Sequence, residues 1–273
     1  MNEFVTALIE FTFLQNAIFA CLLASVGCGI IGTYIVVKKI SFLTGGIAHS
    51  VLAGMGMAYF YNASPIMGAI IAALVSSIMI GWINLRWKEH EDVLIAAFWS
   101  AGMAIGILFL SRTPGYNVDL MSYLFGNILM ITHSDLSLMF LLDMIVIAFV
   151  FVYYKHFLVS VYDEEFARLR GINTELFYIL LLCLISITIV ILIQLVGLIM
   201  VIALLTLPAA IASQYVTSLH KMFLLSTVIC ALISITGVSI SFGPDLPTGS
   251  VIVLTACCAY FFSVVLKQIL SSK

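Results

Sequence analysis

The stretch ILLLCLISITIVILI, residues Ile179–Ile193, contains no charged side chain. A second stretch of this kind, VIVLTACCAYFFSVV, covers Val251–Val265. A helix of about 20 apolar residues crosses the hydrocarbon core of a bilayer, and both stretches approach that length. Over the whole chain 63% of the residues are hydrophobic and 9% are charged, whereas a soluble domain carries roughly 25% charged residues. The sequence therefore predicts an all-α protein, a polytopic bundle of helices embedded in a lipid bilayer.

The basic residues predict how the chain crosses the membrane, because cytoplasmic segments are enriched in Lys and Arg. The Lys and Arg residues fall into five groups and one single residue, Arg112. If all five groups are placed on the cytoplasmic side, ten of the eleven Lys and Arg residues are cytoplasmic and only Arg112 lies outside. These groups are Lys38 with Lys39, Arg86 with Lys88, Lys155 with Arg168 and Arg170, Lys221, and Lys267 with Lys273. We expect nine crossings, with the N-terminus outside and the C-terminus inside. The net charge of −2 gives no indication of a nucleic acid partner.

The turns between the expected spans fall at residues that break helices. The seventh span is short and contains Pro208, so eight crossings is the alternative count. The moderately apolar stretch Asn117–Ile131 is expected to form a short helix at the outer surface. The nine expected spans are 14–37, 40–60, 65–85, 93–111, 135–154, 175–194, 197–213, 221–242 and 250–267.

Two ionisable side chains are expected deep in the membrane. His49 follows Lys39 by ten residues, which at 1.5 Å per residue is roughly 15 Å of helix, and Asp143 precedes Lys155 by roughly 18 Å. Burial of such groups is costly, and they often mark transport paths. Imidazole and carboxylate are good ligands for Zn²⁺ and Mn²⁺. Both residues are candidates for a metal path, and the alternative for each is a polar group bonded between helices.

The outer side carries a second group of candidates, His133, Asp135 and Asp245. Together these side chains would attract a cation to the entrance of the path. His133 and Asp135 also stand at the start of a long apolar span, where a polar residue caps a helix. For these two residues the cap is the favoured interpretation.

The longest polar stretch is the expected cytoplasmic segment Ser160–Gly171, SVYDEEFARLRG. Its acidic residues come first, its basic residues follow, and Gly171 is placed as a helix C-cap. It is either a solvated loop or a docking helix for a cytoplasmic partner. No G-x-x-x-x-G-K-[ST] phosphate-binding loop occurs in the chain, so ATP hydrolysis would have to come from another chain.

Four patches, in order over nearly the whole chain, resemble the ABC-3 family of metal permeases, which import zinc, manganese or iron. The first, ISFLTGGIAHSVLAG, is similar to the family's histidine motif in the second span. The patches are Ile40–Gly54, Tyr123–Leu129 followed by His133–Leu136, Asp163–Gly171, and Val196–Ala210.

The resemblance implies a type II ABC importer permease fold in one membrane-spanning domain, 1–273, with a cytoplasmic coupling loop at 155–174. It implies that His49 lines the metal path and that the region of Pro208 is a short, broken span. The implied partners are a second permease copy, cytoplasmic ATP-binding subunits and an extracytoplasmic metal-binding protein, in a bacterial cytoplasmic membrane. The chain itself would be no enzyme, and Zn²⁺, Mn²⁺ or Fe²⁺ would be cargo and not a permanent cofactor. The residues placed at the ATPase contact are Asp163, Glu164, Glu165, Phe166, Ala167, Arg168 and Gly171.

One position departs from the family pattern. Many members carry an Asp one helical turn before the histidine, and this chain has Gly45 there. We expect Asp143 or a residue of the second copy to replace that carboxylate, or the metal to be held loosely.

Two other classes of function remain as alternatives. A stand-alone secondary transporter would show several charged residues at mid-membrane and often two equivalent halves, which the sequence does not display. An intramembrane enzyme would need a cluster of catalytic side chains, whereas the five histidines are spread along the chain.

Overall fold

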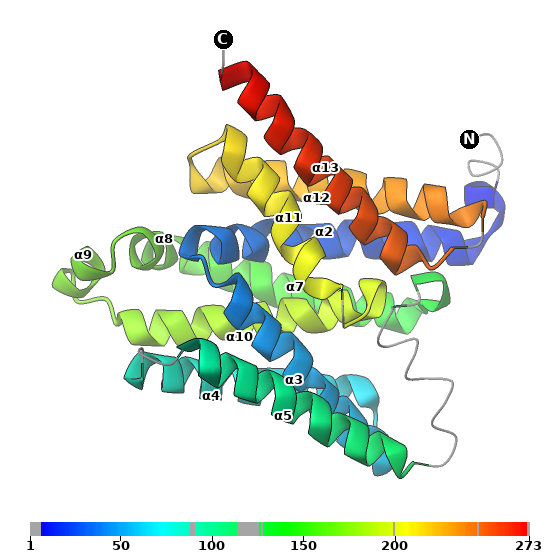
Figure 1. The fold of residues 1–273 in the computed structure, drawn as a ribbon, viewed down its shortest axis with the longest axis horizontal. Helices are drawn as coiled ribbons and strands as arrows, with labels where there is room; N and C mark the ends of the chain where they lie inside the picture. Colours follow the sequence, from blue (N-terminus) through cyan, green and yellow to red (C-terminus); the bar gives the residue numbers. More distant parts are fainter. Residues whose placement is uncertain are drawn as a thin grey trace. The chain divides into compact units, whose positions relative to one another are not determined.

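The computed structural model describes residues 7–87, 91–113, 126, 128–198, 200–244 and 246–271. Every regular element in these ranges is a helix, as the sequence predicts (Figure 1). The elements are α2 (Thr12–Lys38), α3 (Ser41–Phe60), α4 (Pro65–Arg86), α5 (Glu91–Ser111), η2 (Ile128–Met130), α7 (His133–Val152), α8 (Tyr154–Tyr162), α9 (Glu164–Leu169), α10 (Thr174–Val196), α11 (Val201–Tyr215), α12 (Leu219–Phe242) and α13 (Thr248–Ser271).

A helix occupies each of the nine expected spans, but the count of nine crossings is not confirmed. Within the described residues, seven helices are long and apolar enough to cross a membrane: α2, α4, α5, α7, α10, α12 and α13. Helix α3 falls short because it includes four glycines, two serines, a threonine and a histidine. Helix α11, with 15 residues, is shorter than the roughly 20 that a bilayer requires.

The break in the chain near α11 lies before the helix and not at Pro208. Helix α10 ends at Val196, and Gly197 follows with φ of 76°, a left-handed conformation that favours glycine. Helix α11 then continues through Pro208 to Tyr215. The predicted outer helix at Asn117–Ile131 lies largely outside the described residues, and its described part contains η2.

The helices gather into two compact units. The first comprises Met1–Val36, Ser122–Ile147 and Ile191–Lys273, and the second comprises Val37–Met121 and Ala148–Val190. Helices α2, α7 and α10 each contribute to both units, and α2 does so through its last two residues, Val37 and Lys38.

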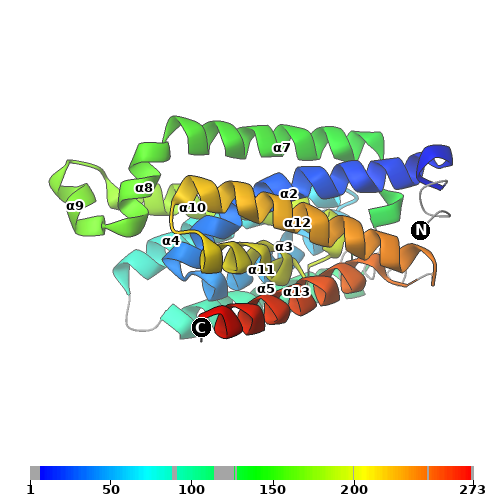
Figure 2. The ribbon, with the colours of Figure 1, turned by 90° about the horizontal axis from the view of Figure 1, so that it is seen from above.

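In the first unit α11, α12 and α13 pack against one another (Figure 2). Two polar contacts support this packing: the Tyr215 hydroxyl lies 3.0 Å from the Ser263 hydroxyl, which donates to Gln214 at 3.0 Å. Helix α2 approaches α11 so closely that a Cβ on Gly32 would collide with the carbonyl oxygen of Leu205. Small residues permit such close helix contacts in membranes.

In the second unit α3 packs against both α4 and α5. Gly56 and Gly106 allow the backbones of α3 and α5 to touch, since a Cβ on Gly106 would lie 2.6 Å from the Leu52 carbonyl oxygen. Gly102 permits the same approach beside Ser50. This close contact fixes which residues of α5 face the middle of α3, where His49 lies.

Candidate functional site

His49 lies in the middle of α3, buried, with 6% of its surface exposed. Its ring stacks on the indole of Trp99 from α5, with the ring centroids 4.0 Å apart and the planes 13° from parallel. The glycine contacts between α3 and α5 bring Trp99 to this distance. The stack holds the imidazole in one orientation, as a ligand with a fixed direction requires.

The Nδ1 atom of His49 is buried and has no hydrogen-bond partner among the described residues. A buried polar atom without a partner is costly, so such an atom usually has a function or a missing partner. A neutral imidazole offers one nitrogen lone pair, which can accept a proton or coordinate a metal ion. Gly45, one turn earlier on α3, is also buried but provides no carboxylate.

Asp143 belongs to α7 in the first unit, whereas His49 belongs to the second. Asp143 is 2% exposed, and neither carboxylate oxygen has a hydrogen-bond partner in the described part of the chain. The thiol of Cys28, on α2, is close enough to Asp143 to interact with it electrostatically. Among the described residues no three His, Cys, Asp or Glu side chains form a group that could hold a metal ion. A joint site for His49 and Asp143 therefore stays a prediction.

The outer candidates His133 and Asp135 lie at the start of α7, where His133 is exposed and Asp135 is half-buried. Asp135 Oδ2 accepts hydrogen bonds from the Thr132 backbone N–H at 3.0 Å and from the Thr132 hydroxyl at 2.6 Å. The Thr132 hydroxyl in turn accepts from the Asp135 backbone N–H at 3.3 Å. This reciprocal arrangement is a capping box, with Thr132 as the cap. A role in attracting cations stays a prediction for both, and Asp245 lies outside the described residues.

The polar segment after α7 forms two short helices, α8 and α9, joined at Asp163. The Asp163 carboxylate accepts from the Phe166 backbone N–H at 2.9 Å and caps α9. After α9, Gly171 adopts φ of 77°, and the Ile172 N–H donates to the Ala167 carbonyl at 3.0 Å. The sequence predicted the end of this helix at Gly171, whereas the carboxylate cap that Asp163 provides at its start was not predicted.

Arg168 ties α9 to its surroundings. Its Nη2 donates to Glu164 Oε1 at 2.9 Å, and its Nε donates to the Thr174 hydroxyl at 3.1 Å. Ala167 is fully buried, so it anchors α9 and offers no surface to a partner. Phe166, at 43% exposed, and Leu169, at 86%, present apolar side chains on the outside of this polar helix.

Two residues of these sites were not predicted. Trp99 stands fifty residues from His49, and no spacing rule connects them; only its place on a glycine-rich helix hinted at a helix contact. Leu169 lies inside the predicted segment, and an apolar residue between Arg168 and Arg170 was the available signal.

Comparison with known proteins gives a consistent assignment. The ABC 3 transport family matches residues 10–267. A probable metal transport system membrane protein of Chlamydia pneumoniae is 39% identical, with 91% of this chain and 87% of that protein covered. The manganese transport system membrane protein MntC of Halalkalibacterium halodurans is 31% identical, with 96% and 91% covered.

A solved structure is similar over almost its full length. PsaBC from Streptococcus pneumoniae, in complex with a Fab, superposes with a TM-score of 0.88 at 30% identity, covering 96% of this chain and 94% of that one. The chain is thus a multi-pass membrane transport protein and not an enzyme, and it belongs to the ABC 3 transport family.

Proposed function

We propose that this chain is the translocating permease of an ATP-driven importer, and that its cargo is a divalent transition-metal ion, with Mn²⁺ first. The observation that carries the proposal is His49, a buried imidazole held by Trp99 whose Nδ1 has no partner among the described residues. The names of the relatives supply the cargo, since MntC of Halalkalibacterium halodurans is a manganese transport protein. Zn²⁺ and Fe²⁺ remain competitors, because imidazole binds all three.

A single imidazole holds a divalent ion weakly, so further ligands are needed along the path. Asp143 and a carboxylate or imidazole of a second permease copy are the two sources that we consider. Mn²⁺ favours oxygen ligands more than Zn²⁺ does, which makes a carboxylate the expected companion of His49. A site with few ligands also releases its ion readily, as transport requires.

The energy source is proposed to be a separate ATP-binding subunit that docks on α8–α9. Phe166 and Leu169 supply apolar contact area, and Glu165 together with Arg170 supplies charges around it. Exposed apolar side chains with a polar rim are typical of protein interfaces. An extracytoplasmic metal-binding protein completes the proposed importer by delivering the ion at the opposite face.

The cargo and the energy source can be tested together in proteoliposomes that contain the permease and its ATPase. We expect uptake of radioactive ⁵⁴Mn²⁺ that depends on ATP and is competed by unlabelled Mn²⁺ at lower concentrations than by Zn²⁺ or Fe²⁺. If Zn²⁺ or Fe²⁺ competes at lower concentrations than Mn²⁺ does, the cargo is that ion and not Mn²⁺. Uptake by the permease alone, driven by an ion gradient, would favour the secondary transporter instead.

Replacing Leu169 with glutamate is expected to weaken capture of the ATPase at least tenfold, since a central apolar contact at an interface contributes about 1–2 kcal/mol or more. Pull-down of the purified ATPase measures the effect. The matched control is Met130→Glu on η2, also an exposed apolar residue, which should leave capture unchanged.

Charge reversal by Glu165→Lys together with Arg168→Glu should weaken docking as well. Because Arg168 also holds Glu164 and Thr174, this double variant combines the loss of docking with a local loosening of α9. Equal capture of the ATPase by wild type, Leu169→Glu and the double variant would refute the docking role of α9.

A further inference from the structure

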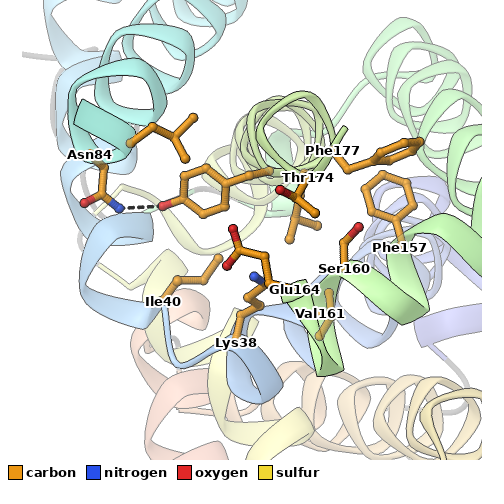
Figure 3. A pocket seen from close by; sticks show the side chains of 12 residues that line it. Lys38, Ile40, Asn84, Phe157, Ser160, Val161, Glu164, Thr174 and Phe177 are labelled. Atoms are coloured by element: carbon orange, nitrogen blue, oxygen red, sulfur yellow. Dashed lines mark hydrogen bonds between the residues drawn. The ribbon is translucent and has the colours of Figure 1, made fainter. Parts of the chain in front are cut away.

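A cavity of about 280 Å³ lies inside the second unit, away from His49, beside α8 and α9 (Figure 3). Its size is close to the lower end of small-molecule pockets, roughly 300 Å³. The end of α2, the end of α4 and the start of α10 all contribute to its wall. These are ends of three helices long enough to span a membrane, so we expect the cavity at the level where lipid head groups meet water.

Hydrogen-bond donors reach the cavity from three different elements: Lys38 ends α2, Ser160 belongs to α8, and Thr174 begins α10. Ser160 is 5% exposed, and its hydroxyl has no partner among the described residues. A serine side chain has three rotamers, so this hydroxyl can turn toward an occupant. The Thr174 hydroxyl accepts from Arg168, which leaves its own proton to donate.

The charges around the cavity favour an anion. Glu164 is the acidic residue of the wall, and Arg168 offsets its charge through the 2.9 Å ion pair. Lys38 in the wall and Arg168, which contacts the wall residues Glu164 and Thr174, thus bring two positive charges against the one negative charge of Glu164. The N-terminus of the 23-residue helix α10 adds the positive end of its dipole at Thr174.

Most of the remaining wall is apolar and includes Ile40, Phe157, Val161, Phe177 and Leu181. Asn84 and Tyr178 also line it, and the Asn84 amide donates to the Tyr178 hydroxyl at 2.7 Å. An occupant with an anionic group at one end and hydrocarbon at the other would match both halves. Lysine, hydroxyl and helix N-terminus are together the donors that proteins use for phosphoryl oxygens.

We propose that this cavity binds a phosphoryl group, with Lys38, Ser160 and Thr174 as its donors. The source is either the head group of a phospholipid or a soluble phosphate compound. Occupancy would join α2, α8 and α10 behind the exposed surface of α9 and so stiffen it. The binding itself concerns this chain alone and is independent of the cargo and of the ATPase.

Binding is tested with the full chain, stripped of lipid in a nonionic detergent, by titration followed through the thermal unfolding midpoint. The probes are dihexanoyl phosphatidic acid, inorganic phosphate and dihexanoylglycerol, which lacks the phosphate. Ligands that bind the folded state alone raise the midpoint by an amount that grows with the logarithm of the ligand concentration divided by Kd. We expect saturable stabilisation by phosphatidic acid and none by dihexanoylglycerol.

Lys38→Gln and Ser160→Ala should each weaken binding about tenfold, as expected for a hydrogen bond to a charged group. Lys39→Gln is the matched control: it removes the same charge one residue away, at an exposed position outside the cavity wall, and should change binding less than twofold. Equal affinity for inorganic phosphate and phosphatidic acid assigns a soluble ligand, and stronger binding of phosphatidic acid assigns a lipid. The proposal is overturned if neither phosphatidic acid nor inorganic phosphate gives saturable stabilisation, or if dihexanoylglycerol raises the midpoint as much as phosphatidic acid does. It is also overturned if Lys39→Gln weakens binding as much as Lys38→Gln does.

Discussion

Uptake of Mn²⁺ is expected to fall to background when His49 is replaced with alanine, a loss of roughly 100-fold or more. Changes to the groups that merely orient a metal ligand already cost 10–100-fold, and loss of the ligand itself should cost more. Insertion into the membrane should persist, because alanine is less costly than histidine within the hydrocarbon. The measurement is initial uptake of ⁵⁴Mn²⁺ in proteoliposomes, with the amount of inserted permease determined on the same samples.

The control for this experiment separates coordination from packing. Trp99→Phe keeps an aromatic ring against His49, and it should retain most of the uptake because the imidazole nitrogens are untouched. His49→Gln preserves a polar group of similar size but removes the imidazole, and it should behave like alanine. Wild-type uptake in both His49 variants would remove His49 from the metal path.

The second large effect is expected at Gly106, where substitution by valine should destabilise the second unit by about 3 kcal/mol, at the upper end for overpacked sites. A Cβ there would lie 2.6 Å from the carbonyl oxygen of Leu52, and backbone atoms cannot rotate away as a side chain can. The contact between α3 and α5 would open and Trp99 would move from His49. Thermal unfolding in detergent, followed by the helical circular dichroism signal, measures the loss.

Gly243 provides the matched control, because a Cβ added there meets no atom within 4 Å. Gly243→Val should leave the unfolding midpoint within a few degrees of wild type. If Gly106→Val were equally stable, the close backbone contact between α3 and α5 would not be needed for the fold.

The sequence predicted the positions of the long helices well, because length and apolarity act locally. The expected span 65–85 corresponds to Pro65–Arg86, and 221–242 corresponds to Leu219–Phe242. Hydropathy was a poor guide where one segment must both cross the membrane and carry polar or small residues. Helix α3 must carry His49 and glycines for close packing, so it is less apolar than its neighbours, and its crossing does not follow from hydropathy.

The site was predicted less completely than the helices. His49 stood out because it interrupts an apolar stretch, and the C-cap of α9 at Gly171 followed from short-range chemistry. Trp99 could not be predicted, since the position of α5 along α3 depends on glycine contacts between segments fifty residues apart. The same holds for Asp143. Its burial within α7 could be predicted from the sequence, but the residues that surround it depend on tertiary packing.

Helix α9 has six residues, fewer than an isolated helix needs to persist in water. It is maintained by the Asp163 cap, the turn at Gly171, the Arg168 contacts and the buried Ala167. A linear peptide copied from 160–174 would lack the scaffold around Ala167 and Thr174, and it would have to lose conformational entropy on binding. A competitor designed to block the proposed permease–ATPase contact would therefore need a covalent staple or cyclisation that replaces the rest of the protein.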